Sequence, residues 1–583
     1  MPTPLTVINN LRVDFTGESG TVTAVNSISL TVNKGEILGI VGESGSGKSV
    51  TALTLMRLIQ SPGRIAGGSI TWYGKQQPID LLALPEKEMR SFRGHEIGMI
   101  FQEPMTSLNP LFTCGSQVAE AIRLHKKVSA KEAKAQTIAL FQKVKLPSPE
   151  QIWGRYPHEL SGGQKQRVMI AMAISCKPKL LIADEPTTAL DVTVQKTILE
   201  LLKELQAEMD MSIVFITHDL GVIADLADRV TVMYKGNIVE QGPVNDVFHH
   251  PQHPYTKGLL ACRPPLVQRL RRLPMIRDFM EITPDGAITE RATNVSAFVN
   301  SLVLDPLTQQ QRELQLQKSS PLLEVKGLKT WFPVKKNIFG KVESWAKAVD
   351  DVSFDVMEGE TLGLVGESGC GKTTLSRTLL RLIEPTDGSI LYKGKDLCRF
   401  SPAELRDARR NIQIIFQDPY SSLNPRLTVG QAIMEPMKVH GLHGNDKARR
   451  EQARLLLDKV QLRPEHFDRY PHEFSGGQRQ RIVIARTLAL HPEFIICDES
   501  VSALDVSIQA QVLNLLMELR EEFNFTYIFI SHNLSVVNFM SDRMMVMNKG
   551  KIEEIGPSEQ VYRHPASPYT QKLIASIPGM AAS

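Results

Sequence analysis

The chain has 583 residues, of which 42% are hydrophobic and 22% are charged, an ordinary balance for a globular protein. Its 67 lysines and arginines barely outnumber its 63 aspartates and glutamates, for a net charge of +4. The chain as a whole therefore lacks the basic field that favours nucleic-acid binding, and we expect no nucleic-acid partner. Global disorder and collagen-like structure are excluded, and the length predicts about four structural units.

The cysteines and the apolar runs bear on where the protein works. The six cysteines lack CxxC spacing, and the chain start lacks a basic and then apolar signal segment. Both features favour a reducing cytosol. No stretch of about 18 residues is uncharged and mainly apolar, so other subunits would have to supply any membrane span.

Three motifs occur twice in the same order, which identifies a tandem duplication. The offset is 324 residues at the lysine of the first motif and 314 residues at the serine of the third, so the first half carries about ten extra residues. The matched segments are 42–49 and 366–373, 101–104 and 416–419, and 155–164 and 469–478.

The duplication also sets the predicted domain limits. Each half opens with a strand-like run and closes with His-Pro-x-x-Pro-Tyr-Thr, at 250–256 and at 564–570. The predicted domains are 1–262 and 322–583, and 263–321 is predicted to be a linker with a short helix because it has no sustained period. Within each half, apolar runs of strand length alternate with helical patterns, which predicts an α/β fold with a mostly parallel sheet and flanking helices.

A glycine loop follows an apolar run and opens a helical pattern in each half, the context in which G-x-x-x-x-G-K-[ST] binds phosphate. Glycines let backbone N–H groups point inward, and Lys48 or Lys372 reaches the terminal phosphates. Ser49 and Thr373 supply hydroxyls for Mg²⁺. A single such string can be a mere Gly-rich turn, but its recurrence in matched context favours a phosphate site. The predicted loop residues are Gly42, Glu43, Ser44, Gly45, Ser46, Gly47, Lys48 and Ser49, with Gly366, Glu367, Ser368, Gly369, Cys370, Gly371, Lys372 and Thr373.

An acidic pair follows a second apolar run in each half, where the ligands of open α/β sheets bind. We assign Asp184 and Asp498 to Mg²⁺, and Glu185 and Glu499 to the water that attacks the γ-phosphate. An isolated pair of this kind is more often a helix cap or a solvated turn, and the upstream glycine loop favours the catalytic interpretation.

The Ser-Gly-Gly-Gln segments resemble the signature of ATP-binding-cassette ATPases, and the resemblance covers nearly the whole chain outside the linker. It implies ATP and Mg²⁺ as cofactors and two tandem P-loop domains, each with a helical subdomain. It also implies composite sites in which the signature of one cassette faces the nucleotide of the other. The implied signature residues are Ser161, Gly162, Gly163, Gln164, Ser475, Gly476, Gly477 and Gln478.

Other positions match this family one at a time. Gln102 and Gln417 match the Q-loop glutamines, which we group with the metal site, and His218 and His532 match the catalytic switch histidines. Phe15 and Phe332 match the aromatic residue that stacks on adenine in this family. The alternative is that both are ordinary core residues at the ends of strands.

Segments 103–110 and 418–425, with the closing His-Pro-x-x-Pro-Tyr-Thr tails, resemble the oligopeptide and dipeptide importers, a group that includes glutathione and nickel importers. The resemblance implies a fused pair of ATPase subunits peripheral to the cytoplasmic face of the inner membrane. Two transmembrane permease subunits and an extracytoplasmic substrate-binding protein are the implied partners. Only Cys262 follows the first tail, so we expect no iron–sulfur cluster.

A ribosome-associated tandem-cassette translation factor would need a long charged helical hairpin in the linker, which 263–321 lacks. Cys370 replaces Ser46 beside backbone amides and a lysine, which favours a thiolate, unless the thiol is buried and inert. We expect Leu108 and Leu423 to lie on a surface that couples hydrolysis to the membrane partners.

Overall fold

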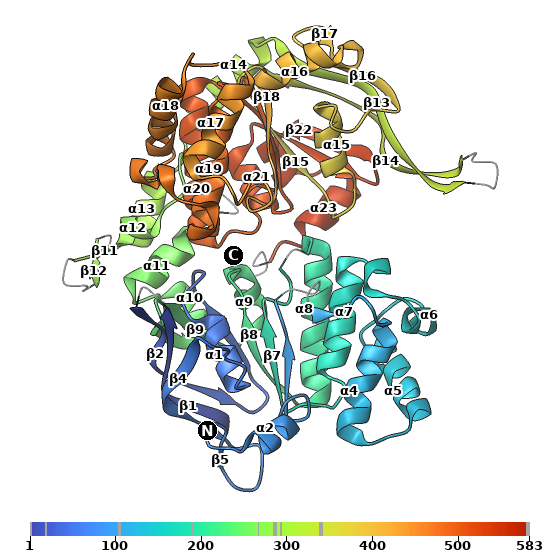
Figure 1. The fold of residues 1–583 in the computed structure, drawn as a ribbon, viewed down its shortest axis with the longest axis vertical. Coiled ribbons are helices and arrows are strands. Elements are labelled where there is room, and N and C mark those ends of the chain that lie inside the picture. The colour runs from blue at the N-terminus through green and yellow to red at the C-terminus, as the bar shows by residue number, and fades with distance from the viewer. Residues whose placement is uncertain are drawn as a thin grey trace. The chain divides into compact units, whose positions relative to one another are not determined.

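The computed structural model describes residues 3–17, 20–102, 107–188, 190–265, 268–283, 288–291, 294–336 and 342–578. Its contacts divide the chain into two units (Figure 1). Unit 1 holds the described residues of Met1–Leu260, Ile276–Thr293 and Pro578–Ser583, and unit 2 holds those of Ala261–Met275 and Asn294–Ile577. The chain thus changes unit several times between residues 260 and 294. The domain limits drawn from the sequence stay a prediction.

The centre of unit 1 is a six-stranded sheet in the order β10-β9-β3-β8-β7-β6, parallel except for the edge strand β10. Its inner strands are buried on both faces, so they read as continuous apolar runs. In β7, Leu181 and Ala183 join one core while Leu180 and Ile182 join another. The strands are β3 (Ile37–Val41), β6 (Ile97–Ile100), β7 (Leu180–Asp184), β8 (Ser212–Ile216), β9 (Arg229–Tyr234) and β10 (Asn237–Pro243).

A four-stranded antiparallel sheet, β2-β1-β4-β5, packs against one face of this central sheet through the second core. Ile8 and Trp72 of the antiparallel sheet share that core with Ile182 and are fully buried. The strands are β1 (Pro4–Gly17), β2 (Gly20–Asn33), β4 (Gly63–Trp72) and β5 (Ile79–Asp80).

Helices cover the other face of the central sheet and extend into a helical subdomain. A capping box between Ser129 and Glu132 starts α5, whose Phe141 is buried in the first core. The helices of unit 1 as far as residue 261 are α1 (Lys48–Leu55), α2 (Glu86–Phe92), α4 (Cys114–Lys126), α5 (Ala130–Lys143), α6 (Pro149–Trp153), α7 (Gly162–Ala173), α8 (Val192–Met209), α9 (Leu220–Leu226), α10 (Val244–His249) and α11 (Pro254–Ala261).

Unit 2 repeats this plan, with a six-stranded sheet β18-β19-β20-β15-β21-β22 and an antiparallel sheet β14-β13-β16-β17. The hairpin of β13 and β14 extends well beyond the rest of the unit (Figure 1). The strands of unit 2 are β13 (Pro321–Lys336), β14 (Val342–Met357), β15 (Thr361–Val365), β16 (Asp387–Tyr392), β17 (Lys395–Asp396), β18 (Ile412–Ile415), β19 (Phe494–Asp498), β20 (Thr526–Ile530), β21 (Arg543–Asn548) and β22 (Lys551–Pro557). The helices of unit 2 from residue 372 onward are α15 (Lys372–Leu379), α16 (Pro402–Asn411), α17 (Val429–Val439), α18 (Asp446–Lys459), α19 (Gly476–Leu488), α20 (Val506–Phe523), α21 (Leu534–Met540), α22 (Ser558–Arg563) and α23 (Pro568–Ile574). The predicted α/β fold with two similar cassettes is confirmed.

Segment 263–321 is more ordered than the sequence predicts. It contains α12 (Ile276–Phe279), β11 (Met280–Ile282), β12 (Ile288–Glu290), α13 (Val295–Ser301) and α14 (Pro306–Lys318). The apolar pattern misses α14 because that helix buries only Leu316 and is attached to unit 2 by polar side chains. Among the described residues, no helix combines the length and apolar content that crossing a membrane requires.

Candidate nucleotide-hydrolysis sites

The glycine loop of unit 1 connects β3 to α1 and needs glycine at two positions. Gly42 has φ 151° and Gly47 has φ 101°, and an added Cβ would lie 2.2 Å from the Met233 carbonyl oxygen at the first and 2.5 Å from the Ala24 carbonyl oxygen at the second. The backbone is therefore fixed by close packing under the loop. At Gly45, by contrast, none of the described atoms lies within 4 Å of an added Cβ, so the top of the loop is open to a ligand.

Lys48 is the buried cation of this loop. The residue is only 6% exposed, and its Nζ donates to the carbonyl oxygens of Gly42 and Glu43, both at 2.8 Å. The buried Ser46 Oγ has no hydrogen-bond partner among the described residues. A cation and an unsatisfied hydroxyl in a turn at a helix start fit the phosphate chain of a nucleotide.

Asp184 ends β7 beside this loop. Ser49 Oγ donates to Asp184 Oδ1 at 3.1 Å, and burial raises the pKa of Asp184 to about 6. A hydroxyl and a carboxylate oxygen in contact are hard oxygen ligands of the kind that Mg²⁺ prefers, so the predicted metal residues fit the ion.

Glu185 follows with a left-handed backbone, φ 49°, which a non-glycine residue adopts at a cost of about 1–2 kcal/mol. Its Oε2 accepts hydrogen bonds from Gln102 Nε2 at 3.2 Å and Thr188 Oγ1 at 2.9 Å, and lies 3.4 Å from His218 Nδ1. Burial opposes ionisation, but the hydrogen bond and charge of His218 outweigh it and lower the pKa of Glu185 to about 2. This group is thus an ionised carboxylate that can orient a water.

Unit 2 assembles the same residue types. Lys372 Nζ donates to Gly366 O at 2.9 Å and Glu367 O at 3.0 Å, and Thr373 Oγ1 lies 3.5 Å from Asp498 Oδ1. Around the second glutamate, Gln417 Nε2 donates to Glu499 Oε2 at 2.9 Å and His532 Nδ1 lies 3.7 Å from the same oxygen. Both predicted glutamine–glutamate–histidine groups are therefore brought together within their own unit.

The expected thiolate at Cys370 is wrong. The residue is 6% exposed, and burial raises the pKa of its thiol despite Lys372 nearby. Cys497, which precedes Asp498, is fully buried, and burial raises the pKa of its thiol to about 12. The alternative of a buried thiol in the glycine loop is the one that the structure supports.

The signature segments also have structural roles within their own unit. Ser161 caps α7 through a capping box, in which its Oγ accepts from Gln164 N at 3.3 Å and Gln164 Oε1 accepts from Ser161 N at 3.0 Å. The second glycine allows close packing against α8, since a Cβ at Gly163 would lie 2.7 Å from Val194 Cγ1. Ser475, Gln478 and Gly477 repeat these roles in α19, with Ile508 as the packing partner.

The two candidate adenine-stacking residues differ in their surroundings. Phe15 is half-buried against the core under the antiparallel sheet, with its ring close to Gly63. Phe332 on β13 is 40% exposed. Of the two, Phe332 presents the more accessible ring.

Tyrosines of the two closing tails contact the glycine loops, which the sequence did not suggest. Tyr255 in α11 is fully buried, and its hydroxyl oxygen accepts the backbone N–H of Glu43 at 3.1 Å. Tyr569 in α23 accepts the N–H of Glu367 at 3.2 Å. The recurrence of Pro-Tyr-Thr in both tails was the available signal.

The expected coupling leucines are also wrong as surface residues. Leu108 is 1% exposed and packs in the first core of unit 1, and Leu423 is 2% exposed. The exposed apolar side chains after the first Q-loop are Leu111 at 79% and Phe112 at 56%. Residues 103–106 of the subfamily segment lie outside the described residues.

Comparison with known proteins decides the family. The family model described as "ABC transporter" matches residues 25–188 and 349–502. The chain belongs to the ATP-binding-cassette transporter family. A second model of this family's importers, described as "Oligopeptide/dipeptide transporter, C-terminal region", matches residues 239–284 and 554–583, which include both tail tyrosines.

Two curated relatives of this ATP-binding-cassette chain are glutathione import ATP-binding proteins named GsiA. The Salmonella choleraesuis protein is 51% identical over 574 residues, and the Escherichia coli protein is 49% identical over 579 residues. Each match covers 98% of this chain and 89% of the relative. The cassettes of this family bind ATP, and the chain is an ATPase coupled to transport. These matches give no support to a ribosome-associated factor.

Proposed function

We propose that the chain hydrolyses Mg·ATP at both cassettes to drive an importer for peptides or related small solutes, with glutathione as the leading candidate. The observation that carries the proposal is the matched pair of sites, each with a loop lysine, an Mg²⁺-type aspartate and an ionised glutamate beside a histidine. The substrate class rests on the tails and on the names of the GsiA relatives.

In each site the protein binds the triphosphate and positions a water. The loop amides and Lys48 hold the phosphates, while Ser49 and Asp184 hold Mg²⁺. Bound Mg·ATP supplies the phosphoanhydride bond whose hydrolysis drives transport. Glu185 orients the attacking water, and His218 keeps that carboxylate ionised and in place. The equivalent group in unit 2 acts through Glu499 and His532.

The exposed apolar residues that follow Gln102 are the proposed contact with the membrane partners. Gln102 reaches Glu185 at one end, and the segment after it exposes Leu111 and Phe112 before α4. A change at the γ-phosphate can therefore move an apolar surface patch. We propose that two transmembrane permease subunits receive this movement, at the cytoplasmic face of the inner membrane, and that an extracytoplasmic binding protein delivers the cargo.

The test is co-purification of the chain with its permease subunits and reconstitution of that complex. The purified complex should hydrolyse ATP faster when its binding protein is loaded with glutathione or a short peptide than when that protein is empty. Retention of ligands by the isolated binding protein identifies the cargo. Failure of the chain to co-purify with any permease, or equal ATPase with loaded and empty binding protein, would contradict the proposal.

A further inference from the structure

Unit 2 contains a cavity of about 900 Å³ that is walled partly by the segment between the cassettes. Residues 269–272 and α14 form one side, and α20 with strands β14, β21 and β22 forms the other. All of its lining residues belong to unit 2. The volume lies within the range of about 300–1,000 Å³ that small-molecule sites occupy.

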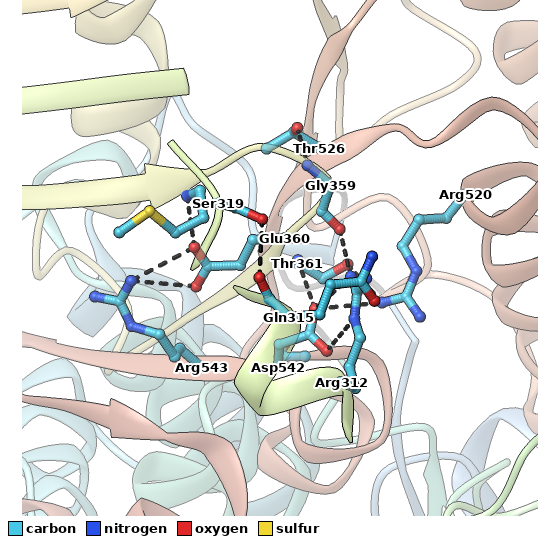
Figure 2. A network of polar contacts seen from close by, with 12 residues as sticks. Arg312, Gln315, Ser319, Gly359, Glu360, Thr361, Arg520, Thr526, Asp542 and Arg543 are labelled. Atoms are coloured by element: carbon cyan, nitrogen blue, oxygen red, sulfur yellow. Dashed lines mark hydrogen bonds and ion pairs between the residues drawn. The ribbon is translucent and has the colours of Figure 1, made fainter. Parts of the chain in front are cut away.

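Asp542 lines this cavity together with Arg269, Arg312 and Arg520. Figure 2 shows Arg312 and Arg520 beside its carboxylate. Its carboxylate oxygens lie 3.3 Å from Arg312 Nη2, 3.5 Å from Arg520 Nη1 and 3.9 Å from Arg269 Nη2. Asp542 is 8% exposed, and the side chains of Arg269 and Arg520 are 19% and 14% exposed. One carboxylate therefore faces three largely buried guanidinium groups.

The remaining acids near these arginines are exposed or already paired. Glu313, Glu518 and Glu521 line the cavity with exposed side chains, so water screens their charges. Glu559 lies near Arg269 but forms an ion pair with Arg563 at 2.9 Å. The buried cluster is left with an excess of positive charge, which a bound anion would offset.

A second ion pair, between Glu360 and Arg543, lies beside the Asp542 cluster (Figure 2). Glu360 is fully buried and forms an ion pair with Arg543 at 3.4 Å, and Arg543 also contacts Asp355 at 3.2 Å. Figure 2 shows this pair on one side of α14's Gln315 and the Asp542 cluster on the other. Arg543 thus faces two carboxylates, so this second group adds no positive charge, and the excess of arginines over acids is confined to the Asp542 cluster.

Unit 1 shows that a cassette does not need these arginines. Asp228, which matches Asp542, accepts the Ile37 N–H at 2.8 Å, just as Asp542 accepts the Thr361 N–H at 2.9 Å. The position that matches Arg520 is Gln206, whose Nε2 donates to the Gly35 carbonyl oxygen. The aspartate is therefore a shared structural residue, and the guanidinium groups are an addition in unit 2.

Part of the cavity wall is apolar, with leucine and methionine from both the intercassette segment and the cassette. Its main apolar residues are Leu270, Leu302, Leu304, Leu316, Met357 and Met517. A ligand that satisfied the whole cavity would need an apolar body as well as a negative head group.

We propose that this cavity binds a small organic anion, with a carboxylate or phosphate head on the arginines and an apolar body against the leucines and methionines. Such a ligand contacts α14 and residues 269–272 on one side and α20 on the other, so it ties the intercassette segment to the second cassette. The site is separate from the glycine loops, and the proposal does not rest on the transported cargo.

The test uses the full chain with its nucleotide sites filled by Mg²⁺ and a non-hydrolysable ATP analogue. Anilinonaphthalene sulfonate, an apolar anion, serves as the fluorescent probe, and octanoate, octyl phosphate and octanol compete with it. We expect octanoate or octyl phosphate to displace the probe at concentrations where octanol does not, and the stronger of the two identifies the head group. Equal displacement by octanol, or no displacement by either anion, would overturn the proposal.

Two variants locate the site. Arg520→Gln installs the residue of unit 1 and should weaken anion binding about tenfold or more, because a buried charged hydrogen bond is lost. The matched control, Arg399→Gln, removes an equal charge from a side chain that is 88% exposed and lies outside the cavity, and should bind the anion like the parent. If Arg520→Gln does not fold, Arg269→Gln replaces it. Parent-like binding in a folded arginine variant of the cavity would refute the assignment.

Discussion

In unit 1, Glu185 Oε2 accepts hydrogen bonds from Gln102 and from Thr188, whereas in unit 2 Glu499 Oε2 accepts one from Gln417, and Glu499 Oε1 lies 4.0 Å from Lys372 Nζ. The residue that matches Thr188 is Ser502, and its hydroxyl donates to the backbone carbonyl of Glu499 instead. The two sites therefore hold the same carboxylate with different partners.

The metal-site aspartates differ in the same way. Asp498 accepts a hydrogen bond from Ser376 at 3.1 Å, a residue of α15 whose matched position in unit 1 is Ala52. Asp184 accepts its hydrogen bond from Ser49. The duplication has kept the residue types that hydrolysis needs while the hydrogen bonds that position them have diverged, which predicts two active sites of unequal sensitivity to substitution.

The largest expected effect comes from removing each glutamate's charge. Glu185→Gln or Glu499→Gln keeps the shape of the side chain but not the ionised carboxylate, so hydrolysis at that site should fall by about 10²–10⁴. ATP binding should remain, and steady-state ATPase with nucleotide binding measures both. The control is Glu208→Gln, an exposed glutamate outside the site. A double variant within threefold of the parent would show that other carboxylates do the work.

The next effect tests whether the two units contact the membrane partners equally. Unit 1 exposes Leu111 and Phe112, where the matched residues of unit 2 are Arg426 and Leu427. Leu111→Ser with Phe112→Ser should lower the stimulation of ATPase by loaded binding protein about tenfold while basal ATPase stays, because two apolar contacts are lost. Arg426→Ser is the control in unit 2 and should change it less. Equal losses from both changes would remove this distinction between the units.

A smaller effect tests the tail tyrosines, where the two units agree. Tyr255→Phe or Tyr569→Phe removes only the hydroxyl that accepts the loop N–H of Glu43 or Glu367. The loop should then hold nucleotide about three- to tenfold more weakly, because one neutral hydrogen bond of about 1 kcal/mol is lost. Equilibrium binding of ATP should shift more than kcat does. An unchanged affinity in both variants means that the hydroxyls do not position the loops.

The smallest expected effect comes from the hydroxyl residue that lies three positions after each glutamate, Thr188 in unit 1 and Ser502 in unit 2. Thr188→Val removes a donor to the Glu185 carboxylate and should slow hydrolysis about threefold to tenfold. Ser502→Ala removes a donor to a backbone carbonyl and should change the rate less than about twofold. Single-turnover hydrolysis in each variant provides the measurement, and the reverse order of effects would contradict the structural comparison.

The parts predicted from sequence are those that a short local pattern encodes. The loop lysines, the aspartates at strand ends and the histidines after β8 and β20 all lie beside a strand of the central sheet, and parallel strand ends meet at one edge. The sequence did not predict the burial of Leu108 and could not choose between the two alternatives for Cys370, because burial depends on packing between elements distant in sequence. The same applies to the contact of Tyr255 with a loop more than 200 residues earlier.

Segment 261–275 also has a consequence for how the protein is made. Leu270 and Leu273 are buried in unit 2, but the last residues of that unit leave the ribosome about 300 residues later. At roughly 5–20 residues per second, this segment stays in water for about 15–60 s during each round of synthesis. Unit 1 is by then nearly complete, so the nascent chain carries a folded first cassette followed by an arginine-rich segment whose packing partners in unit 2 are not yet synthesised. Translation speed through residues 294–577 thus sets how long that apolar segment is open to chaperones and proteases.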